Sequence, residues 1–153
     1  MAIVYLGLGT NLGDKAANLH AAVHLISGKI GKVISLSSFY ATAPWGFESE
    51  NSFLNAALCV KTTLSPLEVL HATQAIERTL GRTQKSEKGI YHDRIIDIDL
   101  LLYNGEIIKT TELTLPHPFM LQRDFVMNPL VEIAPDVVHP VSGKKIRELY
   151  EDR

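Results

Sequence analysis

The sequence predicts an α+β fold of the ferredoxin-like type, an antiparallel sheet with helices packed on one face. The main observation is the order of the apolar patterns, which reads strand, helix, strand, strand, helix, strand. The length of 153 residues fits a single domain covering residues 1–153. The composition, 46% hydrophobic and 21% charged, is that of an ordinary globular protein.

The first half of the chain supplies three predicted strands and one helix. Residues 3–8 are apolar and rich in β-branched side chains, which is typical of a buried strand. The helix that follows ends near Gly28, and its apolar residues recur every three or four positions on one face: Leu12, Ala16, Leu19, Val23 and Ile26. Residues 32–40 and 53–62 are the next two strands, and the second of these alternates clearly.

The second helix has the clearest boundaries in the sequence. Ser65 is the expected N-cap, Pro66 occupies the first helical position, and Glu68 completes a capping box. The inner face of this helix is Val69, Thr73, Ile76 and Leu80. Gly81 is the expected end.

The second half of the chain is less regular. Residues 83–94 are polar and without periodicity, so we expect them to form a mobile lid over a binding site. Residues 95–103 form a strand that turns at Asn104 and Gly105 and returns as residues 106–108. A short helix is expected near residues 120–127.

Charge and cysteine content exclude several classes of protein. A net charge of −2 and a pI near 6.3 argue against a general nucleic-acid binder. The single cysteine, Cys59, excludes an internal disulfide, and we interpret it as a small buried side chain. No apolar run reaches the ~20 residues of a membrane helix. The first nine residues lack a basic leader and a cleavage pattern, so we expect a cytoplasmic protein.

Asp97 and Asp99 are the strongest candidates for a metal site. Residues two apart on a strand share a face, so both carboxylates point one way while Ile98, Leu100 and Leu102 point into the core. Magnesium is often held by one or two carboxylates together with substrate phosphates. The pair alone is a weak signal, because two aspartates also suit a solvated strand face. A cluster of cations just upstream favours phosphoryl transfer: Arg82, Lys85, Lys88 and Arg94.

Two further groups suggest binding of a flat polar ring and of phosphate. Phe53 and Asn55 share one strand face, where a ring can stack and an amide can both donate and accept. An aromatic residue on a solvated sheet face explains that pair equally well. His117, between two prolines and close to Arg123, is placed to contact phosphate oxygens if the other signals hold.

Taken together, these segments resemble the 6-hydroxymethyl-7,8-dihydropterin pyrophosphokinase family. The resemblance extends in order over nearly the whole chain and covers residues 6–14, 38–44, 53–57, 74–82 and 94–100, followed by residues 115–117, Arg123 and Phe125. It implies transfer of diphosphate from ATP to the pterin alcohol, with two magnesium ions bound by Asp97 and Asp99. Arg82 and Arg94 would join these aspartates as catalytic residues.

The resemblance also implies two sets of binding residues. The pterin would contact Thr42, Ala43, Trp45, Phe53, Asn55 and Phe125. ATP would contact Gln74, Glu77, Lys85, Leu100, His117 and Arg123. The expected partners are these two small molecules, with no nucleic acid and no membrane, and the expected state is a monomer.

The main alternative is a non-catalytic ferredoxin-like module that binds a small ligand or RNA. Such a module does not require paired aspartates beside a cationic segment, and an RNA-binding sheet would carry a basic excess. An ordinary kinase of the γ-phosphate is a second alternative. The glycine-rich phosphate loop followed by Lys-Ser or Lys-Thr is missing from the sequence.

Overall fold

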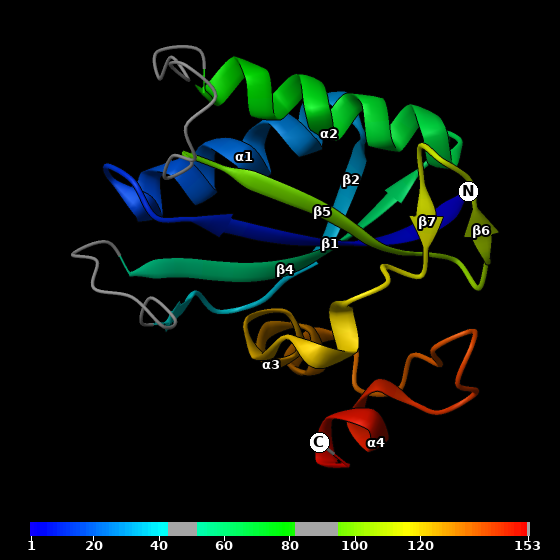
Figure 1. Cartoon of the computed structure of the whole chain (residues 1–153). Coiled ribbons are helices and arrows are strands. Elements are labelled where there is room, and N and C mark those ends of the chain that lie inside the picture. The colour runs from blue at the N-terminus through cyan, green and yellow to red at the C-terminus, as the bar shows by residue number, and fades with distance from the viewer. Residues whose placement is uncertain (43–51, 82–94, 153) are drawn as a thin grey trace.

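The computed structural model describes residues 1–42, 52–81 and 95–152 (Figure 1). Its main sheet is antiparallel, with strand order β2-β4-β1-β5 and with β3 paired to β4. The strands are β1 (Ala2–Thr10), β2 (Gly31–Leu36), β3 (Tyr40–Thr42), β4 (Phe53–Thr62) and β5 (Asp97–Tyr103). A second sheet of two short strands, β6 (Ile108–Lys109) and β7 (Thr114–Leu115), lies after β5 in the chain.

Helices cover both faces of the main sheet. The helices α1 (Lys15–Lys29) and α2 (Pro66–Gly81) lie on one face, as the sequence predicts. On the other face, a 3-10 helix (Met120–Gln122) leads into α3 (Asp124–Ile133), and α4 (Ile146–Glu151) packs against α3. Figure 1 shows these last helices beneath the sheet, opposite α1 and α2. The predicted ferredoxin-like layout is therefore confirmed, and the C-terminal third adds a layer to it.

Both large helices begin with a side-chain cap. The carboxylate of Asp14 accepts a hydrogen bond from the backbone N–H of Ala17 at 3.1 Å. At α2, the Ser65 hydroxyl accepts from the N–H of Glu68 at 3.2 Å, and the Glu68 carboxylate accepts from the N–H of Ser65 at 2.8 Å. The capping box predicted from the sequence is therefore confirmed.

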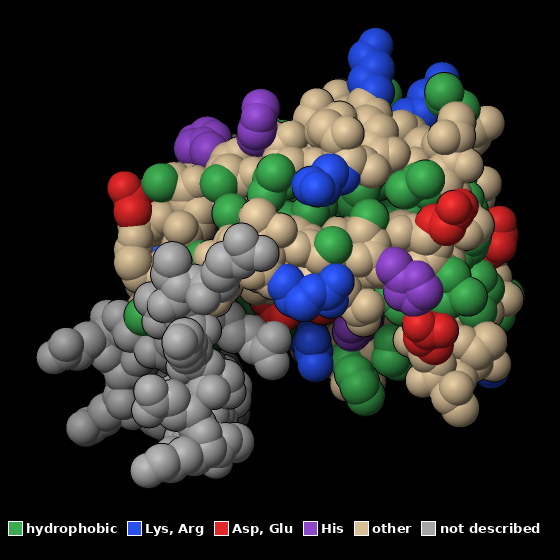
Figure 2. All heavy atoms as spheres, turned by 90° about the horizontal axis from the view of Figure 1, so that it is seen from above, with side chains coloured by type: hydrophobic (Ala, Val, Ile, Leu, Met, Phe, Trp, Pro, Cys, Tyr) green, Lys and Arg blue, Asp and Glu red, His purple; other side chains and the backbone are tan. Residues whose placement is uncertain are grey.

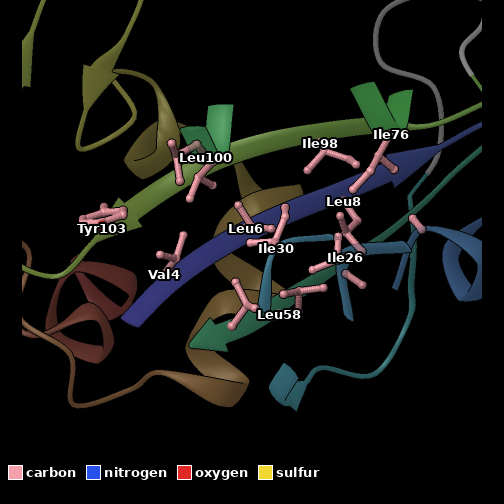
Figure 3. Packing of buried hydrophobic residues seen from close by; sticks show 14 of the residues in the cluster. Val4, Leu6, Leu8, Ile26, Ile30, Leu58, Ile76, Ile98, Leu100 and Tyr103 are labelled. Atoms are coloured by element: carbon pink, nitrogen blue, oxygen red, sulfur yellow. The ribbon is translucent and has the colours of Figure 1, made fainter. Parts of the chain in front are cut away.

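The main core lies between the sheet and the helices α1 and α2 (Figure 3). Val4, Leu6 and Leu8 project from β1 into this core, because alternate residues of a strand share a face. Their neighbours there come from both adjacent strands and both helices, and include Leu58, Ile98, Leu100, Ile26 and Ile76. The odd-numbered positions of β1 therefore face the opposite side of the sheet.

The prediction that Leu102 shares a face with Ile98 and Leu100 is wrong. In the pairing of β1 with β5, Leu6 lies opposite Leu100 but Tyr5 lies opposite Leu102, so Leu101 is an extra residue. Such a β-bulge shifts the alternation by one. Leu102 consequently packs in a second core with α3 and α4.

The prediction of one strand over residues 32–40 is also wrong, because the chain forms β2 and β3 with a break between them. At the break, the buried Ser37 hydroxyl accepts a hydrogen bond from the N–H of Ala57 at 2.9 Å. The backbone N–H of Ser38, the residue after Ser37, donates to the carboxylate of Glu132 in α3. The Ser37 N–H still donates to the backbone oxygen of Ala57 at 2.9 Å, so side chains replace only part of the strand ladder at this point.

The expected turn at Asn104 forms, but the return does not pair with β5. Asn104 has a φ of 50°, and both its backbone N–H and its side-chain oxygen bond to the backbone of Ile3. These two hydrogen bonds hold the turn against the N-terminal end of β1. Ile108 of β6 then pairs with Leu115 of β7 instead.

The helix expected at residues 120–127 is two helices. Arg123 has extended backbone angles, φ −113° and ψ 112°, which separate the 3-10 turn from α3. The second of these helices runs on to Ile133 with Pro129 inside it. The helix α4 was not expected from the sequence.

The helix face carries side chains of both charges. Figure 2 shows Lys and Arg side chains of the described residues on this face, with hydrophobic side chains between several of them and acidic side chains mostly toward its edges. A hydrogen bond joins His71 of α2 to Glu112, with 2.6 Å between Nε2 and Oε2. Across residues 1–42, 52–81 and 95–152, none of the helices combines the length and hydropathy needed to cross a bilayer.

The close pairing of β2 with β4 requires glycine at position 31. A Cβ atom on Gly31 would lie 2.1 Å from the backbone oxygen of Lys61. We expect Gly31→Ala to lower the free energy of unfolding by about 1–3 kcal/mol, the usual cost of overpacking. Urea denaturation measures this change.

A matched substitution tests whether the steric contact is the cause. A Cβ atom on Gly28, near the end of α1, would meet no atom within 4 Å. Gly28→Ala should therefore raise the free energy of unfolding by about 0.5–1 kcal/mol through helix propensity. Equal effects of the two substitutions would contradict the steric explanation.

Candidate active site

The central strand has two positions without side chains on the face opposite α1 and α2. Gly7 and Gly9 of β1 point to that face, because Leu6 and Leu8 point into the main core. Gly9 lies between Asp97 of β5 and Asn55 of β4, and Gly7 pairs with Asp99. The two glycines therefore leave a hollow between the acidic pair on one side and the amide on the other.

A cavity of about 540 Å³ opens over this hollow. Its floor comes from β1, β4 and β5, and its outer wall from the residues around the start of α3. Seven residues predicted as site residues line it: Thr42, Phe53, Asn55, Asp97, Asp99, Arg123 and Phe125. Residues from four separate parts of the sequence thus meet as the sequence analysis expects.

The amide of Asn55 is fixed on the cavity floor. This side chain is 3% exposed, and its Nδ2 donates a hydrogen bond to the hydroxyl of Thr42 at 3.1 Å. A Cβ atom on Gly9 would lie only 2.9 Å from Oδ1 of Asn55. Glycine at position 9 is therefore needed to leave room for the amide as well as for a ligand.

Phe53 and Phe125 both line the cavity, one from β4 and the other from α3. Phe53 begins β4, pairs with Thr42 of β3, and is partly buried. Lys15 of α1 supports this strand end, since its Nζ donates to the backbone oxygen of Ser52 at 2.8 Å. Phe125 lies in the first turn of α3 and is 40% exposed, so its ring is available to a ligand.

The acidic pair has a third carboxylate beside it. Oε2 of Glu77, on α2, accepts a hydrogen bond from the N–H of Ile98 at 2.8 Å, which satisfies a backbone donor on the edge strand β5. Burial and, to a smaller extent, the neighbouring Asp97 and Asp99 together raise the pKa of Glu77 to about 7, against the opposing effect of that hydrogen bond. The start of β5 is thus a strongly acidic region.

Asp97 and Asp99 fit a magnesium site of the kind completed by a substrate. Both carboxylates line the cavity, and hard oxygen ligands are those that magnesium prefers. In the part of the chain that the structure describes, no group of three or more acidic, His or Cys side chains could hold a metal by itself. The donor set therefore suits a cation that also takes ligands from a bound phosphate.

His117 is held as a neutral donor near the acidic pair. Its backbone N–H donates to the oxygen of Leu101 at 3.0 Å, and its Nδ1 accepts from the N–H of Phe119 at 3.2 Å. Burial lowers the pKa of His117, and the positive charge of Arg123 lowers it further, while Asp97 acts in the opposite direction. The ring is consequently neutral near pH 7, with its proton on Nε2.

Arg123 lies between two aromatic rings. Its guanidinium carbon is 5.4 Å from the centre of the Phe119 ring and 5.6 Å from that of Phe125. Cation–π contacts of this kind hold the charge without removing its hydrogen-bond donors. The guanidinium therefore stays available to an anionic group in the cavity.

The remaining predicted residues lie elsewhere. Gln74 is exposed on α2 and does not line the cavity. Leu100 is 5% exposed and points into the main core (Figure 3), so its side chain does not reach the cavity. The others, together with the lid expected at residues 83–94, lie outside the described residues: Ala43, Trp45, Arg82, Lys85 and Arg94.

The sequence analysis missed several residues that line the cavity, namely Gly7, Leu8, Gly9, Ala56, Gln122, Asp124 and Val126. The two glycines had a readable signal, because glycine at alternate positions of an apolar strand often marks a close approach to the backbone. The residues around α3 had no such signal. Their place depends on how that helix packs on the sheet.

Comparison with known proteins gives a consistent result. The family model described as 7,8-dihydro-6-hydroxymethylpterin-pyrophosphokinase (HPPK) matches residues 5–135. The chain is 55% identical over 141 residues to the 2-amino-4-hydroxy-6-hydroxymethyldihydropteridine pyrophosphokinase of Porphyromonas gingivalis, covering 92% of this chain and 95% of that protein. It is 41% identical over 148 residues to the protein of the same name from Aquifex aeolicus, covering 97% and 90%.

Solved structures show the same fold. The wild-type HPPK-DHPS of Plasmodium falciparum, crystallised with pteroate, superposes with a TM-score of 0.80 at 20% identity. The match covers 99% of this chain and 42% of that one, so this chain spans less than half the length of the solved protein. At this identity the similarity supports the fold alone.

The raised pKa of Glu77 predicts a stability that depends on pH. Between its ordinary pKa of 4.5 and its folded value of about 7, the folded state binds more protons than the unfolded state. The free energy of unfolding should therefore fall as pH rises through this interval. Glu77→Gln keeps an acceptor for Ile98 and removes the titration, so its stability relative to the wild type should increase from pH 4.5 to 7.

The measurement is urea denaturation across this pH range, with a chelator present to keep metal ions away. Glu151→Gln, at an exposed position of α4, controls for the loss of one negative charge. A constant difference between the Glu77→Gln and wild-type curves would contradict the prediction.

Proposed function

Because the chain belongs to the 7,8-dihydro-6-hydroxymethylpterin-pyrophosphokinase family, we propose that its cavity binds the pterin beside an ATP-magnesium site at the start of β5. The activity is transfer of diphosphate from ATP to the hydroxymethyl group of 6-hydroxymethyl-7,8-dihydropterin, a reaction of folate biosynthesis. The observation that carries the site assignment is the bare strand at Gly7 and Gly9, flanked by two aspartates on one side and Asn55 on the other.

The pterin ring lies between Phe53 and Phe125 in this proposal. A flat heterocycle gains from stacking on aromatic faces, and both rings line the cavity, Phe53 from β4 and Phe125 from α3. Asn55 then reads the polar edge of the ring, with Thr42 holding its amide in place. Ala43 and Trp45, which the family resemblance assigns to the same edge, complete the proposed pterin site.

Asp97 and Asp99 hold two magnesium ions in this proposal. Both carboxylates line the cavity at the end where phosphate would approach the pterin alcohol. When bound, magnesium would neutralise charge on the phosphate oxygens and lower the pKa of the alcohol. The nearby Glu77 carboxylate acts through the backbone of β5, since it bonds to the N–H between the two aspartates.

The triphosphate lies against His117 and Arg123. The Nε2–H of a neutral His117 donates to an oxygen, and Arg123 offers several donors with a full positive charge. Arg82, Lys85 and Arg94 are proposed to contribute further cations. Gln74, Glu77 and Leu100 are proposed on the nucleotide side, where Leu100 contributes through its backbone or the packing beneath the site.

In the reaction, the alcohol oxygen of the pterin attacks the β-phosphorus of ATP. The bond between that phosphorus and the oxygen bridging to the α-phosphate breaks, AMP leaves with that oxygen and the electron pair of the bond, and the proton of the alcohol passes to water. The protein forms no covalent bond, so its contribution is to align the alcohol with the β-phosphorus and to stabilise charge. Asn55 with the two aromatic rings orients the acceptor, and Arg123 with His117 orients the phosphates.

We further propose that the enzyme acts as a cytoplasmic monomer on two small molecules and does not bind nucleic acid. The pterin-binding side and the acidic end of β5 both come from one chain. The net charge of −2 gives no general attraction to nucleic acid.

A product assay tests the activity of this chain directly. Purified protein is incubated with magnesium, ATP and 6-hydroxymethyl-7,8-dihydropterin, and AMP is separated from ADP. We expect AMP to form only when the pterin is present. Formation of ADP would indicate an ordinary kinase, and no turnover by folded protein would support a non-catalytic binding module.

Removal of either cavity aspartate should abolish turnover. Charge neutralisation by metal ions in such sites contributes several kcal/mol, so Asp97→Ala and Asp99→Ala should each lower kcat/KM by at least about 100-fold. Asp136→Ala, which removes an exposed partner of Arg147, should leave the rate unchanged. Thermal unfolding would check that the variants fold, and near-normal activity in both cavity variants would refute the metal assignment.

A further inference from the structure

A single carboxylate joins α3 to the segment that enters β3. Glu132, near the end of α3, accepts hydrogen bonds from the backbone N–H of Ser38 at 3.1 and 3.0 Å, one to each carboxylate oxygen. It also accepts from the Ser38 hydroxyl at 3.3 Å and from the Tyr40 hydroxyl at 2.6 Å. We call this set of contacts the Glu132 clamp, and it joins residues 94 and 92 positions apart in the sequence.

The clamp acts on the short strand β3. Within residues 1–42, 52–81 and 95–152, this strand has three residues, pairs in the sheet with β4 alone and packs against α3. Within this pairing, Tyr40 lies opposite Asn55 and Thr42 lies opposite Phe53. The Thr42 hydroxyl also accepts the hydrogen bond from the Asn55 amide. Movement of β3 would therefore change the position of the amide and of Phe53.

The other end of the clamp is on the helix that forms the opposite wall of the cavity. α3 begins with Asp124 and carries Phe125 in its first turn, while Arg123 is its N-cap residue. Pro129 removes one backbone hydrogen bond inside α3, but Val126, Met127 and Leu130 are buried in one core, so holding Glu132 also limits the movement of Phe125 relative to the sheet. The clamp thus links the two sides between which the pterin is proposed to bind.

The clamp is well formed although it is exposed. Hydrogen bonds to a carboxylate are stronger than neutral ones, and here one carboxylate receives them from both a backbone and two hydroxyl donors. In agreement, the hydrogen bond from Tyr40 and those from Ser38 lower the pKa of Glu132. Because it lies at the surface and outside both cores, its loss should affect geometry more than folding.

We propose that Glu132 is a positioning residue for the pterin, and that the Glu132 clamp sets the gap between Phe125 and the side of the cavity formed by Phe53 and Asn55. This inference rests on the proposed function, because it requires the pterin to occupy that gap. Glu132 itself does not line the cavity and acts through β3 and α3. Substitution of Glu132 should consequently weaken binding of the pterin and leave binding of ATP unchanged.

The test is direct binding to Glu132→Ala, Glu132→Gln and Tyr40→Phe, measured by calorimetry with magnesium present. The two probes are a non-hydrolysable ATP analogue, and 6-hydroxymethylpterin added to protein saturated with that analogue. A misplacement of ~1 Å in a site can cost about 100-fold, so we expect Glu132→Ala to weaken pterin binding by at least about tenfold. Binding of the ATP analogue should be unchanged.

The other variants separate positioning from general destabilisation. Glu132→Gln keeps one acceptor oxygen and should restore much of the pterin affinity, while Tyr40→Phe loses only the shortest bond and should have a smaller effect than Glu132→Ala. Glu151→Ala, an exposed glutamate of α4, is the control and should change neither affinity.

Each remaining outcome has a distinct meaning. Unchanged pterin binding by Glu132→Ala would overturn the clamp proposal, even if the thermal midpoint falls. Equal weakening of the pterin and of the ATP analogue would also overturn it, because that pattern indicates a general loss of structure. Failure of the wild-type protein to bind the pterin would instead reject the proposed function itself.

Discussion

The site depends on the absence of side chains from two alternate positions of the central strand. β1 is flanked by β4 and β5, so a side chain at Gly9 would stand on the cavity floor, and one at Gly7 would stand at its edge against Leu101. At Gly9 a side chain would also collide with the amide of Asn55. Glycine weakens a strand interior. Here the cost is offset on the other face of the same strand, where Val4, Leu6 and Leu8 are buried in the main core.

The second helical layer determines where the cavity ends. A Cβ atom on Gly7 would lie 3.5 Å from Leu101, a residue of the core beneath α3. The second core therefore begins next to Gly7. Beyond Gly7, the ends of β1, β4 and β5 near Gly9, Asn55 and Asp97 line the cavity. The bulge at Leu101 contributes to this arrangement, because it turns Leu102 toward the same core without moving Asp97 and Asp99 off the cavity face.

Features that depend on neighbouring residues could be predicted from the sequence, and features that depend on distant contacts could not. The capping box of α2 and the shared face of Asp97 and Asp99 follow from spacing alone. The bulge is a property of the pairing between β1 and β5, so alternation misplaced Leu102. The break between β2 and β3 is stabilised by Glu132, a contact over 94 residues that no local pattern contains. Gln122, Asp124 and Val126 of the outer wall were missed for the same reason, whereas Arg123 and Phe125 of that wall were among the predicted residues.

The group of carboxylates that suits the proposed site to cations lowers the stability of the protein by itself. Glu77 is partly buried beside Asp97 and Asp99, and its raised pKa shows that negative charge is disfavoured there. A fold selected for stability alone would replace one of these groups with a neutral residue. Concentrated charge of this kind is typical of functional sites, where local stability is lower than elsewhere in the protein. In the proposed magnesium complex the positive charge of the ion would relieve this repulsion, so the unfavourable interaction among the carboxylates supports the proposed cation site.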